Sequence, residues 1–202
     1  NKSRFNLLIC SVLGFFIWLT SYYAPTSEAE TYLKSDDAVT VSIDNNFICF
    51  TPTNITPTKG FILYPAAKVD AKAYAKICKM ISQQGYQVVA VDMPFNFSAF
   101  GKNKANEVMN KYNNIEHWVI GGDSLGGLVA TRYVNSKLDN IDGVVLISSY
   151  PSDSYLKEVN MNVLSIWARK DGVIDFQSLI DAKEKLPPDT TYVEIEGANH
   201  SQ

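Results

Sequence analysis

The sequence predicts an α/β fold with a mostly parallel sheet of about seven or eight strands and helices on both faces. From residue 38 onward, segments of strand length alternate with segments whose apolar residues recur at helical spacing. Several of the strand-like segments are almost entirely apolar, as expected of strands that are buried on both faces of a sheet. Repeated strand–helix units of this kind form largely parallel sheets.

The expected strands and helices follow one another along the chain. A hairpin is expected from segments 39–43 and 47–50, because they flank the turn residues Asp44-Asn45-Asn46. Further strands are expected at 61–64, 87–92, 117–122, 143–149, 163–168 and 191–197. Helices are expected at 71–84, 104–112, 125–136 and 176–186. Pro187-Pro188 should end the last helix.

The composition is that of a globular protein without a nucleic-acid or metal site. Of the 202 residues, 46% are hydrophobic and 12% are aromatic, which is enough for a sizeable core. The net charge of -3 and the lack of a long basic run argue against a nucleic-acid partner. With two histidines, three cysteines and neither a CxxC nor an HExxH pattern, no metal site is expected.

The first 30 residues differ in kind from the rest of the chain. Residues 5–24 are predominantly apolar and follow Lys2 and Arg4, and 20 residues suffice to cross a bilayer as a helix. We expect residues 1–30 to be a transmembrane anchor with a short polar linker, which places the domain of residues 31–202 outside the cytoplasm. The alternative is a signal peptide that is cleaved after Ala29, so that the domain is secreted.

The segment GGDSLGG, residues 121–127, joins an expected strand to an expected helix and contains the pattern G-x-S-x-G around Ser124. In this pattern the serine lies on a sharp turn, and small neighbours let backbone segments approach closely. The helix that follows presents its amino end, which makes the N–H of Leu125 a candidate oxyanion donor. A phosphate-binding loop is the alternative, but the patterns G-x-G-x-x-G and G-K-[ST] are missing. Ser124 is therefore a candidate nucleophile.

A serine nucleophile needs a base and an acid that orients the base. His117 begins a strand and should lie about 15 to 20 Å from Ser124, at the opposite edge of the sheet. His200 follows the last strand and lies at the same edge as Ser124, so it is the candidate base. Asp171 follows strand 163–168 at that edge and is the candidate acid, with Asp175 as the alternative. The order serine, aspartate, histidine is that of α/β-hydrolases.

From about residue 35 to its last residue, the chain resembles the membrane-tethered bacterial group of the alpha/beta hydrolase fold-5 family. The resemblance is carried by LKSDDAVTV, YPAAKVDAKAYA, VDMPFNFSAF, HWVIGGDSLGG, DGVVLISSYP, VLSIWARKDGV and VEIEGANHSQ. It implies the α/β-hydrolase fold and serine-dependent hydrolysis without a cofactor. It also implies catalytic roles for Ser124, Asp171 and His200.

Two features depart from that family. Where relatives resemble P-G-G after strand 61–64, this chain has Ala66-Ala67, and the N–H of Ala67 is the candidate second oxyanion donor. Lys68, the next residue, is expected to be a solvated surface lysine, with attraction of an anionic substrate as the alternative. Relatives continue beyond the segment around His200 to a closing helix, so we expect the hydrolase domain to be truncated at its carboxyl end.

Two further loops should reach the same edge of the sheet. Residues 93–100 offer Phe95 and Asn96, and residues 149–155 offer Tyr150, as candidate pocket residues. Packing beneath the loops is the alternative for the aromatic rings. The short connection between strands 143–149 and 163–168 leaves no room for a large lid.

The sequence therefore predicts a serine hydrolase that cleaves a carboxylic ester or related acyl bond of a small molecule through an acyl-enzyme. One alternative is a membrane-tethered binding protein that has kept the fold without turnover. The other is an acyltransferase that uses the same three residues.

Overall fold

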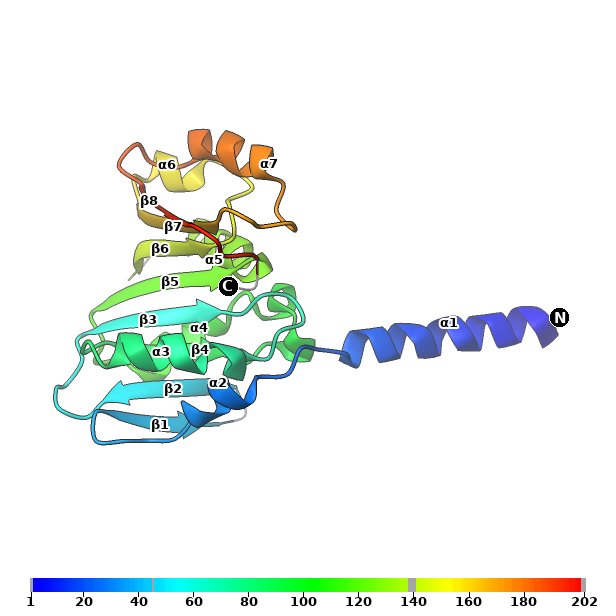
Figure 1. Cartoon of the computed structure of the whole chain (residues 1–202), viewed down its shortest axis with the longest axis horizontal. Helices are drawn as coiled ribbons and strands as arrows, with labels where there is room; N and C mark the ends of the chain where they lie inside the picture. The colour runs from blue at the N-terminus through cyan, green and yellow to red at the C-terminus, as the bar shows by residue number, and fades with distance from the viewer. Residues whose placement is uncertain (1, 45, 138–140, 201–202) are drawn as a thin grey trace.

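In the described residues, eight strands form one mixed sheet in the order β1-β2-β4-β3-β5-β6-β7-β8 (Figure 1). The computed structural model describes residues 2–44, 46–137 and 141–200. The strands are β1 (Val39–Ile43), β2 (Phe47–Pro52), β3 (Lys59–Tyr64), β4 (Gln87–Val91), β5 (His117–Asp123), β6 (Ile141–Ile147), β7 (Asn162–Ala168) and β8 (Thr191–Ile195). Among the described strands, β2 alone runs opposite to the others, and the pairs from β4 to β8 are parallel, so the predicted mostly parallel sheet is confirmed.

Helices connect the strands where the sequence predicts them, with some differences in extent. The α-helices are α1 (Lys2–Thr20), α2 (Ser27–Thr31), α3 (Ala75–Ser82), α4 (Lys104–Lys111), α5 (Leu125–Ser136), α6 (Tyr155–Glu158) and α7 (Phe176–Asp181). Short 3-10 helices are η1 (Ala71–Tyr74), η2 (Pro94–Asn96), η3 (Ser98–Gly101) and η4 (Ala182–Lys185). The described connection between β6 and β7 contains the four-residue α6 and, as predicted, no large lid.

Two predicted helices were too long. The segment 71–84 divides into η1 and α3, because the side chain of Asp70 caps the N–H of Lys72 and starts a tight turn before the α-helix begins. The segment 176–186 likewise divides into α7 and η4 at Ala182. Apolar spacing does not distinguish a 3-10 turn from the end of an α-helix, since both place neighbouring side chains on one face.

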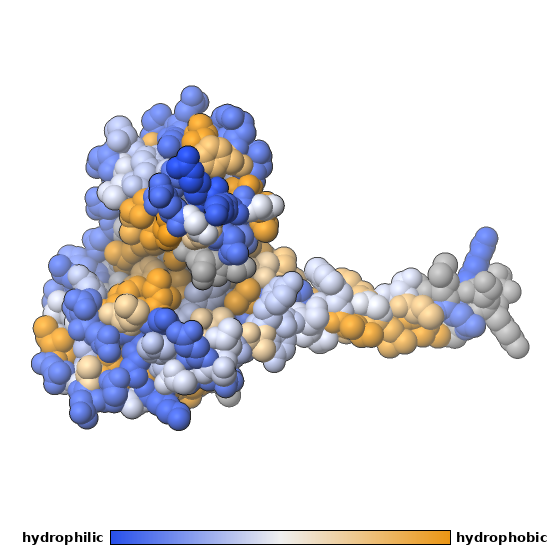
Figure 2. Space-filling view, viewed as in Figure 1, coloured by the Kyte–Doolittle hydropathy of each residue, from blue (hydrophilic) through white to orange (hydrophobic). Residues whose placement is uncertain are grey.

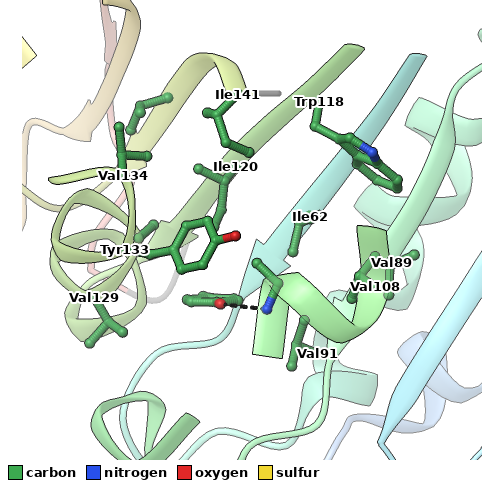
Figure 3. Packing of buried hydrophobic residues seen from close by; sticks show 14 of the residues in the cluster. Ile62, Val89, Val91, Val108, Trp118, Ile120, Val129, Tyr133, Val134 and Ile141 are labelled. Atoms are coloured by element: carbon green, nitrogen blue, oxygen red, sulfur yellow. Dashed lines mark hydrogen bonds between the residues drawn. The ribbon is translucent and has the colours of Figure 1, made fainter. Parts of the chain in front are cut away.

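The helices cover the sheet in two layers with a core on each side. On one side α4 and α5 pack against the central strands, where Ile62, Val91 and Ile120 meet Val108 and Tyr133 (Figure 3). On the other side α3 packs over β2, β3 and β4 through Ala75 and Cys78. These strands read as continuous apolar runs because both of their faces are buried.

The layer that contains α3 does not extend over β5 to β8. On this face Val119, Val145, Ile147 and Ile166 are half-buried and Val193 is exposed, and no helix of the described segments covers them. Figure 2 shows hydrophobic residues gathered in a hollow on the same side of the molecule.

The N-terminal helix α1 projects from the body of the protein (Figure 1). Many of its apolar side chains are exposed, including those of Phe15, Phe16 and Ile17. Within the part of the chain that the structure describes, no helix has the length and apolar character needed to cross a membrane.

The carboxyl ends of the parallel strands lie at one edge of the sheet. β3 leads into Pro65, β5 into Ser124, and β7 and β8 into the loops that carry Asp171 and His200. His117 begins β5 at the opposite edge and pairs there with Asp142 at 3.1 Å. The predicted separation of the two histidines by strand direction is confirmed.

Tyr64 ties the end of β3 to the layer that contains α4. Tyr64 is fully buried. Its hydroxyl donates to the carbonyl oxygen of Lys102 (2.7 Å) and accepts from the N–H of Ala105 (3.0 Å). Tyr64→Phe leaves both groups without this partner, so we expect a loss of about 1–3 kcal/mol in the free energy of unfolding. Urea unfolding measures it, with exposed Tyr86→Phe as the matched control. An equal, small change in both variants would contradict this account.

Candidate active site

Ser124 lies on the turn between β5 and α5 in a rarely used backbone conformation. Its φ is 51° and its ψ is -118°, which places the residue outside the regions that L-amino acids favour. Packing beneath the turn holds it there. A Cβ on Gly122 or Gly126 would overlap the carbonyl oxygen of Tyr64, at the end of β3. Because this oxygen belongs to the backbone, it cannot move away as the end of a flexible side chain could. Only glycine therefore fits at these two positions.

Hydrogen bonds from β6 hold the turn from the other side. The N–H of Ser124 donates to the carbonyl oxygen of Ile147 (2.9 Å), the last residue of β6. The hydroxyl of Ser149 donates to the carbonyl oxygen of Ser124 (2.7 Å). The strained serine is therefore fixed through its backbone, and its side chain is not needed for the turn.

Two backbone N–H groups near this turn have no hydrogen-bond partner among the described residues: those of Leu125 and Ala67. Leu125 is the first residue of α5, where N–H groups lack intrahelical acceptors. Ala67 belongs to the loop after β3, residues 65–70, which we call the β3 loop. The carbonyl oxygen of Pro65 in this loop approaches Gly126 closely, so the loop lies beside the start of α5. One predicted oxyanion donor is therefore at the start of α5, and the other is in the loop that lies beside it.

Asp171 and His200 are brought together by the loops after β7 and β8. His200 Nδ1 lies 2.8 Å from Asp171 Oδ2, with side chains that are 19% and 8% exposed. The other carboxylate oxygen accepts from the N–H groups of Val173 (2.9 Å) and Ile174 (3.0 Å). Partial burial works to raise the pKa of Asp171, but the Ile174 N–H, His200 and the Val173 N–H outweigh it, so the pKa lies below its usual value. The carboxylate is ionised and oriented toward the imidazole.

Asp175, the alternative acid, and His117, the other histidine, make contacts other than the Asp171–His200 hydrogen bond. Asp175 caps α7, where its carboxylate accepts from the N–H (3.1 Å) and the hydroxyl (2.6 Å) of Ser178. His117 is at the far edge of the sheet. In the described part of the chain, no group of three or more histidine, cysteine, aspartate or glutamate side chains is arranged to hold a metal ion.

A second buried acid, missed by sequence reasoning, adjoins the turn of Ser124. Asp123 Oδ2 accepts from the hydroxyl of Tyr74 (2.8 Å), and that hydroxyl accepts from the N–H of Ala66 (3.0 Å). Burial raises the pKa of Asp123, and the neighbouring Asp171 carboxylate adds to the effect while Tyr74 and His200 oppose it. Asp123 Oδ1 is buried without a partner in the described structure. Position 123 is the unspecified second residue of G-x-S-x-G, so the pattern itself could not indicate this role.

The three candidate pocket residues lie in the loops where the sequence placed them. Phe95 packs edge-on against Phe100 at 6.2 Å between ring centroids and remains 54% exposed. Asn96 contributes its carbonyl oxygen, which accepts from the N–H of Lys68 (2.6 Å). Tyr150 is half-buried in the loop after β6. A surface cavity of about 500 Å³ lies at the opposite edge of the sheet, around Thr51 and the segment that follows it.

The ammonium of Lys68 has partners that the sequence did not predict. It donates to the carbonyl oxygens of Trp18 and Leu19 at the end of α1. Nothing in the sequence indicates this contact, because the partners are 49 and 50 residues apart along the chain.

Comparison with known proteins gives a family match and a structural likeness. Residues 60–202 match the model of the alpha/beta hydrolase family. A CIB-like hydrolase from Thermoplasma acidophilum is 18% identical, with a TM-score of 0.66 over 81% of this chain and 89% of that one. The carboxylesterase CesB (YbfK) from Bacillus subtilis is 11% identical, with a TM-score of 0.61 over 86% and 88% of the two chains.

A dienelactone hydrolase from Anabaena variabilis is 14% identical, with a TM-score of 0.66 over 81% of this chain and 89% of that one. At these identities the likeness shows the shared fold. Among curated proteins, none matches the chain in sequence.

The raised pKa of Asp123 predicts a pH-dependent stability with a defined sign. The folded protein holds the Asp123 proton more tightly than the unfolded chain, so this group favours folding at low pH and loses that contribution as the pH rises through the raised pKa. The side chain in Asp123→Asn stays neutral and still accepts from Tyr74. The free energy of unfolding of this variant should therefore rise relative to that of the wild type as the pH increases from 4 to 8. Urea unfolding across this range measures the difference.

The matched control is Asp175→Asn, which should show little change relative to the wild type between pH 4 and 8. The hydroxyl and N–H of Ser178 lower the pKa of Asp175, so this group is ionised in both the folded and the unfolded chain over most of that range, and its contribution to folding is lost only at lower pH. Parallel trends in the two variants would refute the assignment of Asp123 as a buried acid with a raised pKa.

Proposed function

The chain belongs to the alpha/beta hydrolase family, and from this premise we propose that it is a serine hydrolase that cleaves a carboxylic ester or related acyl bond of a small molecule. The observation that carries the proposal is the Asp171–His200 hydrogen bond of 2.8 Å at the sheet edge where Ser124 lies on its strained turn. Nucleophilic serines need such an oriented base, and a family match supports the reading of these residues as a triad.

In the proposed reaction, Nε2 of His200 accepts the proton of the Ser124 hydroxyl as its oxygen attacks the substrate carbonyl carbon. Asp171 holds the proton on Nδ1 and stabilises the imidazolium that forms. The N–H groups of Leu125 and Ala67 donate to the oxyanion of the tetrahedral intermediate. The imidazolium then gives its proton to the departing alkoxide, and a covalent acyl-enzyme remains. A water molecule activated by the same imidazole hydrolyses it and restores Ser124.

Substitution of the three residues tests this mechanism on p-nitrophenyl esters of graded chain length. Ser124→Ala and His200→Gln should reduce turnover to background, and Asp171→Asn should lower kcat by about 10³- to 10⁴-fold because the imidazole loses its orienting partner. A fluorophosphonate should label the wild-type protein at Ser124 and fail to label Ser124→Ala.

The chain offers matched controls for each change. Asp175→Asn keeps a side chain that caps α7 equally well, and His117→Gln alters only the far edge of the sheet, so both should retain activity. Equal losses in Asp175→Asn and Asp171→Asn would refute the triad. Wild-type protein that neither reacts with the probe nor hydrolyses any ester would favour a non-catalytic binding protein. Acyl groups recovered on an added alcohol instead of water would favour an acyltransferase.

Attachment to a membrane is a separate part of the proposal and rests on the sequence of residues 1–30, in which basic residues precede a predominantly apolar segment. The full-length chain should sediment with membranes after carbonate treatment, and protease added to intact spheroplasts should digest the domain. A shorter product in the medium, beginning after Ala29, would instead indicate a cleaved signal. Protection of the domain from protease would place it in the cytoplasm and overturn the proposed orientation.

A further inference from the structure

The β3 loop is bound on its outer side by a segment from the N-terminal part of the chain. The ammonium of Lys68 donates to the carbonyl oxygens of Trp18 (2.6 Å) and Leu19 (2.7 Å), at the carboxyl end of α1. The same nitrogen lies 4.5 Å from the centre of the Trp18 ring. Terminal helix carbonyls lack intrahelical donors and carry partial negative charge, so a lysine ammonium is a favourable partner for them.

Tyr23 continues this contact through its backbone. Its N–H donates to the carbonyl oxygen of Lys68 (2.6 Å), and its carbonyl oxygen accepts from the N–H of Asp70 (3.1 Å), which forms a parallel bridge with Val69. We call residues 18–23 the N-terminal latch. In Figure 1 the chain that leaves α1 passes the carboxyl edge of the sheet before it reaches α2.

Lys68 depends on these partners because its backbone is in the left-handed region, with φ 64°. For a residue other than glycine this conformation is unfavourable by about 1–2 kcal/mol. The N–H of Lys68 donates to the carbonyl oxygen of Asn96, which is itself at φ 52°. Thus the N–H, the carbonyl and the ammonium of Lys68 are all bonded, and two of these three groups are bonded to the N-terminal latch.

The position of Ala67 follows from the residues on either side of it. The N–H of Ala66 is held by the hydroxyl of Tyr74, and Lys68 is held by Asn96 and the N-terminal latch. The peptide of Ala67 lies between these two restrained neighbours, with its N–H unpartnered in the described structure. A peptide fixed in this way can present a donor in advance of the reaction, which is what oxyanion stabilisation requires.

We propose that the N-terminal latch is a positioning element of the active site, which holds Lys68 in its left-handed conformation and thereby directs the N–H of Ala67 at the oxyanion. This inference rests on the proposed function and adds to it a role for the segment between α1 and the hydrolase domain. Lys68 and Tyr23 act through Ala67 and do not contact the substrate in this account.

The test uses full-length Lys68→Met, which keeps the length and apolar stem of the side chain and removes the ammonium. We expect kcat on a p-nitrophenyl ester to fall by about tenfold or more while KM changes less than threefold, because a misplaced oxyanion donor affects the transition state more than substrate binding. Lys68→Arg can still donate to the carbonyls and should recover most of the activity. Hydrogen exchange of the amides of Lys68 and Asp70 should become faster in Lys68→Met.

Lys59→Met is the matched control, because Lys59 is an exposed lysine at the far end of β3. It should leave kcat and amide exchange unchanged. The proposal is overturned if Lys68→Met keeps wild-type kcat, even with faster exchange, because the latch would then not position the donor. It is also overturned if both Lys68 variants lose activity together with a large fall in Tm, which would indicate a role in folding alone.

The two proposals fail in different ways. Wild-type protein without Ser124-dependent hydrolysis would reject the proposed function and, with it, the role of Ala67. Active wild-type protein with an active Lys68→Met variant would reject only the positioning role of the N-terminal latch.

Discussion

The close approach of the Ser124 turn to the backbone at the end of β3 is the constraint on which the candidate site depends. Only glycine at positions 122 and 126 lets the turn pass the carbonyl oxygen of Tyr64. This contact places the start of α5, where Leu125 lies, beside the β3 loop that carries Ala67. The buried Tyr64 hydroxyl in turn anchors β3 to the layer of α4, which makes the end of β3 a rigid support.

Around this support, the site combines a rigid elbow with loops that are held by individual hydrogen bonds. The buried acid Asp123 connects two parts of this arrangement. Tyr74 donates to its carboxylate and accepts from the N–H of Ala66, which links the Ser124 turn to the β3 loop. Burial makes the ionised form of Asp123 unfavourable, and the Asp171 carboxylate adds to this effect while Tyr74 and His200 oppose it.

Much of the fold and the three candidate catalytic residues were accessible from the sequence because they depend on local chemistry and on strand direction. Apolar runs identify strands that are buried on both faces, and in a parallel sheet the loops that follow these strands meet at one edge. This argument separated His200 from His117 without any coordinates. It named Asp171 as the candidate acid and left Asp175, in the same loop, as the alternative. The structure shows the first bonded to His200 and the second capping α7.

By itself, the sequence determined the order of strands and helices, the glycine turn at Ser124 and the edge at which its partners lie, because each is encoded by neighbouring residues. Only the tertiary structure decided the roles of Lys68, Tyr74 and Asp123. Lys68 contacts residues that are 49 and 50 positions away along the chain, and Tyr74 and Asp123, which contact each other, are 49 positions apart. Such contacts are decided by how separate elements pack, since hydrogen bonds between distant segments leave no periodic pattern in the chain.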